Sequence, residues 1–108
     1  MKLKDAVRFA YHFIEKEIDI LESTLPDNEW GDSKINPMYD TKDSLLKFLA
    51  AEYWTPEVVQ CLHTAADYLQ AVMDNEDLSK QMPDWFLSAQ DSVQSLRKHA
   101  SQAQHYFD

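Results

Sequence analysis

The chain has 108 residues, of which 44% are apolar and only one is glycine, and it carries a formal net charge of -9. This length suits one domain with a single core, so we expect residues 1–108 to form one domain. The scarcity of glycine disfavours tight β-hairpins, which need residues at positive φ, and the acidic balance argues against nucleic acids and anionic membranes as partners.

The first predicted helix spans residues 2–24. Its apolar residues recur at steps of four and three, which brings them to one face of a helix. These residues are Leu3, Val7, Ala10, Ile14, Ile18 and Leu21. Leu25-Pro26 then ends the helix, because proline disfavours helical geometry in the residue before it and cannot donate to the backbone ladder.

Residues 25–40 are predicted to form a long loop. They hold the single glycine, Gly31, and two of the four prolines, Pro26 and Pro37. We expect Gly31 and Pro37 to turn the chain. Asp40 or Thr41 then caps a short second helix over residues 41–54.

Two further helices are predicted over residues 55–76 and 83–106. Thr55-Pro56-Glu57 is a strong start signal, with a capping hydroxyl, proline at the first helical position and an acid in the first turn. Met82-Pro83-Asp84 opens the last helix in a similar way. The expected fold is therefore all-α, a single-domain bundle of about four helices.

The sequence contains no recognisable catalytic or metal-binding motif. None of the four histidines stands three or four residues from another, or three residues after a glutamate, as helical metal sites require. Cys61 is the sole cysteine and is predicted to be a buried, inert thiol. The acidic run that begins at Asp27 has its glycine at the fifth position, whereas a calcium loop needs it at the sixth. We expect no enzymatic activity, no metal and no cofactor.

The negative charge is concentrated in the middle of the chain. Residues 48–79 sum to -6 and contain no Lys or Arg. A basic protein partner would be steered towards such a surface. Charged residues near the N-terminus leave no uninterrupted apolar stretch for a signal peptide or a membrane span, so the expected compartment is the cytoplasm.

Acids and aromatic residues occur together in two segments, 27–40 and 52–77. Interfaces that are anchored by Trp and Tyr and rimmed by charge have this composition. The residues predicted to contact a partner are Asp27, Glu29, Trp30, Asp32, Tyr39, Asp40, Glu52, Trp54, Glu57, Asp67, Asp74, Glu76 and Asp77.

Two other interpretations of these residues stay open. The acids of the third helix also fit an ordinary solvated face. The aromatic residues Trp30, Tyr39 and Trp54 equally fit a plug at the open end of the bundle. Against a purely structural role, Asp74 and Asp77 stand near the expected end of the third helix, where the helix dipole disfavours each negative charge by about 0.3–1 kcal/mol.

In size, acidity, helical content and its two acidic and aromatic segments, the chain resembles the small acidic helical immunity proteins that bacteria keep in the cytoplasm. Those proteins neutralise nuclease toxins of the bacteriocin and contact-dependent-inhibition kinds. The resemblance implies that carboxylates pair with the toxin's basic groups while aromatic side chains fill the centre of the contact. The alternatives are a nucleic-acid mimic that inhibits a DNA-binding enzyme, and a helical scaffold subunit, for which self-association into a homo-oligomer through the last helix would be evidence.

Overall fold

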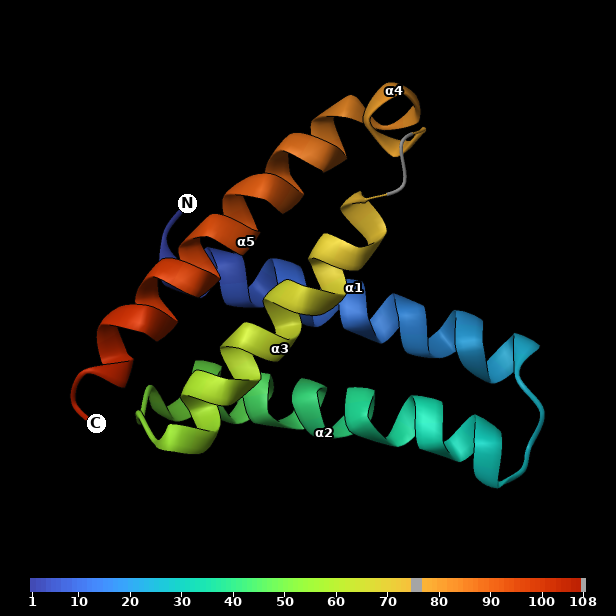
Figure 1. Cartoon of the computed structure of the whole chain (residues 1–108), viewed down its shortest axis with the longest axis horizontal. Coiled ribbons are helices and arrows are strands. Elements are labelled where there is room, and N and C mark those ends of the chain that lie inside the picture. The colour runs from blue at the N-terminus through green and yellow to red at the C-terminus, as the bar shows by residue number, and fades with distance from the viewer. Residues whose placement is uncertain (75–76, 108) are drawn as a thin grey trace.

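The computed structural model describes residues 1–74 and 77–107, and every regular element in them is a helix (Figure 1). In chain order the helices are α1 (Leu3–Thr24), α2 (Glu29–Ala51), α3 (Pro56–Met73), the single turn α4 (Leu78–Gln81) and α5 (Pro83–Gln104). The all-α fold predicted from the sequence is confirmed.

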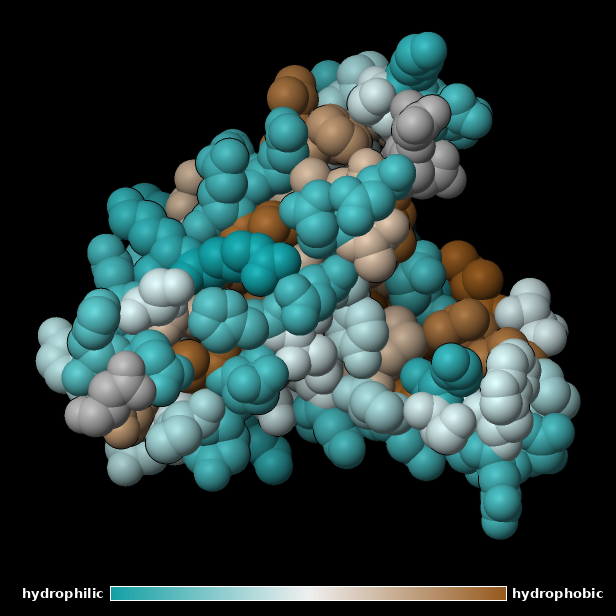
Figure 2. All heavy atoms as spheres, in the orientation of Figure 1, coloured by the Kyte–Doolittle hydropathy of each residue, from teal (hydrophilic) through white to brown (hydrophobic). Residues whose placement is uncertain are grey.

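The four long helices form two antiparallel pairs that cross one another. Helix α1 lies beside α2, and α3 lies beside α5, with α1 passing against both members of the second pair (Figure 1). The molecule measures 40 × 35 × 23 Å. The pairs diverge towards α4 and the α1–α2 turn, and hydrophobic side chains are visible at the surface of the α1–α2 pair facing that divergence (Figure 2).

Helix α1 follows the sequence prediction closely. It ends at Thr24, and the backbone N–H of Leu25 still donates to the carbonyl of Leu21 at 2.8 Å before Pro26 stops the ladder. The predicted apolar face is the buried one, and Ile14 and Ile18 are 0% and 2% exposed. This face supplies the centre of the core.

The predicted loop over residues 25–40, and with it the predicted start of the second helix at Asp40 or Thr41, is wrong. Only residues 25–28 connect α1 to α2, and Asn28 is the cap, because its side-chain oxygen accepts the N–H of Gly31 at 3.0 Å. Pro37 therefore lies inside a helix of 23 residues, where it removes one backbone donor. Packing outweighs this local cost, since Met38, Thr41 and Leu45 are buried on one face of α2.

Gly31 serves close packing at the start of α2. Its φ is not positive, so the expectation that it turns the chain through glycine's conformational freedom is also wrong. A Cβ at this position would lie 2.1 Å from the carbonyl oxygen of Pro26, far inside van der Waals contact. Glycine is needed here because the new helix begins directly against the turn that precedes it.

The later boundaries differ from the predictions by a few residues. Helix α2 ends at Ala51 instead of residue 54, because Glu52 adopts the left-handed conformation with φ 52°. Helix α3 starts as predicted, with the Thr55 hydroxyl accepting the N–H of Val58 at 3.1 Å, but it ends at Met73 instead of residue 76. The turn α4, which the sequence did not predict, fills part of the connection to α5.

Small residues let α1 and α5 approach closely where the pairs cross. Ala6, Ala10, Ala89 and Ser92 are all fully buried. The Ser92 hydroxyl donates to the carbonyl oxygen of Ala6 at 3.0 Å, which joins two residues 86 positions apart. A hydroxyl that is satisfied on a neighbouring backbone is compatible with full burial.

Pro37→Ala is expected to stabilise the protein by about 1–3 kcal/mol. Proline costs about 3 kcal/mol more than alanine inside a helix, and the greater freedom of the unfolded variant offsets part of the gain. Urea denaturation measures the free energy of unfolding. Pro56→Ala is the matched control and should bring no such gain, because Pro56 stands at the first helical position. A loss of stability in Pro37→Ala would contradict the continuous α2.

Ser92→Val is expected to destabilise the protein by about 2–3 kcal/mol, since it removes a buried hydrogen bond and adds volume at the fully buried contact between α1 and α5. Ser101→Val places the same side chain at an exposed position of the same helix and controls for helix propensity. Equal free energies of unfolding for the two variants would show that the crossing tolerates the larger side chain.

Candidate interaction surface

The predicted contact residues lie at three corners of the molecule and not on one continuous face (Figure 1). The first corner is the turn between α1 and α2, the second is the connection between α2 and α3, and the third is the end of α3. The first corner carries Asp27, Glu29, Trp30 and Asp32, and Tyr39 and Asp40 follow further along α2. The second corner carries Glu52, Trp54 and Glu57. The third corner carries Asp74 and Asp77. Asp67 lies on α3 between the last two corners, and Glu76 lies outside the described residues.

We call residues 19–32, which form the end of α1, the turn and the start of α2 at the first corner, the acidic tip. It contains five acids and no Lys or Arg, and all five acids are exposed, in the last two turns of α1, in the connecting turn or in the first turn of α2. The acids are Asp19, Glu22, Asp27, Glu29 and Asp32. Glu29 and Asp32 also favour the start of α2, because the helix dipole is positive there.

A hollow of about 350 Å³ separates the two helices at the acidic tip. Its wall includes Glu22, Asp27, Asp32 and Tyr39, together with apolar Leu25. The Tyr39 hydroxyl donates to the carboxylate of Glu22 across the hollow. This hydrogen bond and the nearby negative charge raise the pKa of Tyr39 above its ordinary value, so the phenol keeps its proton.

The predicted aromatic contact residues fit two different roles. One is contact with a partner, and the other is a plug at the open end of the bundle. Trp30 is 56% exposed at the acidic tip, with the ammonium of Lys34 6.0 Å from its ring centroid, so it is available to a partner. Trp54 is half-buried and packs edge-on against Phe48, with 4.9 Å between the ring centroids. Trp54 therefore does help to close the core, as the plug interpretation expected.

Tyr39 is tied into the packing between α1 and α2. The ammonium of Lys42 lies 5.7 Å from the Tyr39 ring centroid and 5.8 Å from that of Tyr11, and 3.7 Å from a carboxylate oxygen of Glu15. Tyr39 thus bridges the two helices as well as lining the hollow. Asp40 follows it on α2 and is exposed.

Glu57, Asp67 and Asp74 form an acidic stripe along α3 and at its end. All three are exposed, but the fold supplies a positive charge that the local sequence lacks. Asp67 pairs with Arg97 of α5 at 2.9 Å. Asp74 caps the end of α3 and accepts a hydrogen bond from the Gln70 side chain at 2.9 Å. Glu52, at the second corner, pairs with Lys4. The stripe is therefore less negative than residues 48–79 alone suggest.

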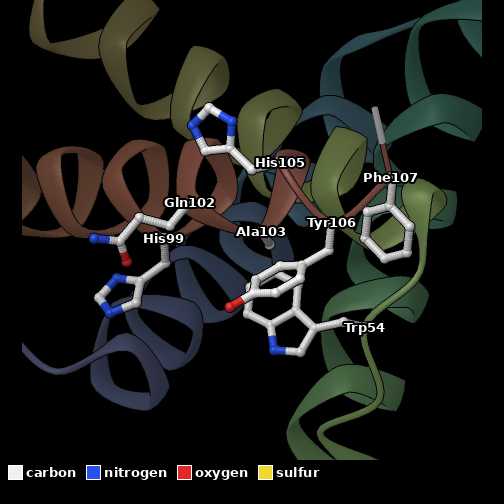
Figure 3. Close-up of a pocket in the computed structure, with 7 residues that line it drawn as sticks. All are labelled: Trp54, His99, Gln102, Ala103, His105, Tyr106 and Phe107. Carbon is white, nitrogen blue, oxygen red and sulfur yellow. The ribbon is translucent and has the colours of Figure 1, made fainter.

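The sequence analysis did not predict an aromatic cluster that lies just after the end of α5. Tyr106 and Phe107 are 87% and 38% exposed, and with His99 and Trp54 they line a hollow of about 790 Å³ (Figure 3). The pair Tyr106-Phe107 after the last amphipathic turn was the available signal. Its proximity to Trp54 depends on the tertiary structure.

No three His, Cys, Asp or Glu side chains among the described residues are grouped so that they could hold a metal ion. No helix within residues 1–74 and 77–107 combines the length and the apolar character needed to cross a membrane.

Comparison of the chain with protein-family models, with curated proteins and with solved structures finds no match in any of the three.

Cys61 is buried in the core, as the sequence predicted. Its thiol is 8% exposed and donates to the carbonyl oxygen of Thr41 at 3.4 Å. Burial raises the pKa of the Cys61 thiol to about 11, outweighing the opposite effect of Ser44. A thiol that stays protonated and inaccessible is a poor nucleophile.

The raised pKa of Cys61 predicts a loss of stability at high pH. Between the ordinary thiol pKa and about 11, the unfolded chain loses this proton while the folded chain retains it, so the free energy of unfolding falls as pH rises through that range. The expected fall is about 2–3 kcal/mol. Urea denaturation from pH 8 to pH 11 measures it, and Cys61→Ala should have a shallower profile. Identical profiles would mean that other groups control the alkaline limit.

Proposed function

We propose that this protein is a cytoplasmic immunity protein that binds and neutralises a basic protein toxin, with a nuclease as the expected target. The acidic tip is the main contact in this proposal. The single observation that carries it is the concentration of five acids within residues 19–32, beside an exposed tryptophan and a hollow, with Lys34 as the one cation placed near that tryptophan among the described contacts. The protein acts by occupying the toxin's surface, and no reaction is required of it.

The charge of the acidic tip supports association with a basic surface. Its carboxylates stand close together at one end of the molecule, so their fields add in the direction from which a partner approaches. Electrostatic complementarity of this kind raises association rates and excludes partners of like charge. A nuclease fits the proposal because it must present basic groups to hold phosphates.

Apolar side chains at the acidic tip support a stable contact after the encounter. Trp30 is 56% exposed and Ile20, beside Asp19 on α1, is 55% exposed. Large side chains that are exposed among charges are typical anchors, since burying them on binding contributes most of the contact energy. The hollow between α1 and α2 offers a complementary recess for a basic side chain, with the Glu22 and Asp32 carboxylates in its wall.

Neutralising the acidic tip is expected to slow association with the toxin about tenfold at low salt. The variant Asp27→Asn/Glu29→Gln/Asp32→Asn changes charge but little else. The matched control, Asp43→Asn/Asp84→Asn/Asp91→Asn, removes the same charge from exposed sites away from the tip. Stopped-flow kinetics at increasing salt should show the two variants converging. Equal rates at low salt would remove the acidic tip from the contact.

The partner is identified by toxicity and rescue. A basic protein that binds the tagged chain must arrest growth when expressed alone and lose that effect when the chain is co-expressed. The tip variant should rescue less well than the control variant at equal protein levels. Rescue that is the same for both variants, or a partner without toxicity, would contradict the proposal.

A further inference from the structure

The hollow at the end of α5 lies at the opposite end of α2 from the acidic tip, and it has a different chemistry. Trp54 enters it from the connection after α2, whereas His99, Gln102, Tyr106 and Phe107 come from α5 and the turn that follows (Figure 3). Its volume of about 790 Å³ falls in the range of about 300–1,000 Å³ that is usual for ligand sites. No described residue that lines it is a lysine, an arginine or an acid.

The aromatic walls of this hollow differ in how firmly they are held. Trp54 is anchored on the core through its edge-on contact with Phe48. Tyr106 stands at the rim, 87% exposed, and can cover a group that rests on Trp54. Aromatic faces carry negative electrostatic potential, so cations bind over them, and tryptophan is the strongest such platform.

Two helices direct their C-terminal ends towards this hollow. Helix α2 ends at Ala51, three residues before Trp54, and α5 ends at Gln104, within the lining segment. In Figure 1 both ends lie towards the same side of the molecule. Neither helix has a basic residue in its last turn. The end of α2 is followed by Glu52, which pairs with Lys4, so the negative end of the α5 dipole is the one that adds to the potential of the aromatic faces. A cation in this hollow is therefore favoured by the negative end of α5.

The hydrogen-bonding groups suit a planar cation. The Nδ1 atom of His99 lies 2.8 Å from the carbonyl oxygen of Ser95, which only accepts, so Nδ1 is the donor in this contact. In the tautomer with the proton on Nδ1, Nε2 is the acceptor. The Gln102 amide adds a second acceptor oxygen. A guanidinium group can stack on an indole while its N–H groups donate in the ring plane, which an ammonium cannot do.

We propose that the hollow lined by Trp54, Tyr106 and His99 binds an arginine side chain of the basic partner, as a second contact separate from the acidic tip. The proposal rests on the basic-partner function, since it names the side chain that such a partner would insert. In the bound state the guanidinium lies between Trp54 and Tyr106, and its N–H groups point towards His99 and Gln102.

The test uses small probes and therefore needs no partner protein. N-acetyl-argininamide is titrated into the full-length protein, and the indole N–H signals of Trp54 and Trp30 are followed by NMR. N-acetyl-citrullinamide is the neutral control of the same shape, and N-acetyl-lysinamide tests an ammonium. We expect saturable shifts at Trp54, with arginine binding roughly threefold to twentyfold more tightly than citrulline and more tightly than lysine.

Two variants locate the site. Tyr106→Ser changes a side chain that is 87% exposed, so the fold should persist, and arginine binding should weaken at least threefold. Trp30→Leu removes the exposed tryptophan of the acidic tip and should leave the affinity unchanged.

Each contrary outcome overturns this proposal by itself. Equal affinity for arginine and citrulline would exclude charge recognition, and tighter binding of lysine would exclude the guanidinium. Shifts at Trp30 alone would move arginine binding to the acidic tip, which would leave the proposed function standing. If the protein bound arginine at Trp54 but neutralised no toxin, the arginine site would stand and the proposed function would fail.

Discussion

The close crossing of α1 and α5 is the constraint on which the rest of the structure depends. Ala6 and Ser92 are fully buried and joined by a hydrogen bond between a side chain and a backbone carbonyl. Only small side chains allow that approach, and larger ones would force the two helical pairs apart. Once the crossing angle is set, the ends of the pairs project from the core, and those ends carry the chain's exposed aromatic and acidic residues.

The crossing also explains why the acids of the acidic tip and the acids of α3 have different neighbours. At the acidic tip the pair α1–α2 extends away from α5, so the carboxylates there meet each other, Tyr39 and solvent. On α3, which packs along α5, Asp67 finds Arg97. Charge that is concentrated in sequence is thus partly neutralised in space, while three acids of the acidic tip line one hollow between α1 and α2.

The helix α2 shows how local signals and packing compete. Gly31, Pro37 and the polar residues around them predict a loop, because each is a turn former. The apolar residues of the same stretch are few, and a helical periodicity is hard to recognise from Ile35, Met38 and Thr41 alone. Their burial against α1 nevertheless stabilises the helix, and glycine serves there because the Pro26 carbonyl leaves no room for a side chain. Such a conflict is resolved only when the neighbouring helix is in place.

The sequence by itself determined the all-α class, the bounds of α1, the start of α3 at Thr55-Pro56, the burial of Cys61 and the overall acidity. Each of these depends on residues close together in the chain, through periodicity, capping or composition. The tertiary structure alone decided which acids stand together, that Arg97 faces Asp67, and that Trp54 shares a hollow with Tyr106. The Asp67–Arg97 pair and the hollow of Trp54 and Tyr106 join residues 30 or more positions apart. Their geometry follows from how two helical pairs cross, which no local pattern encodes.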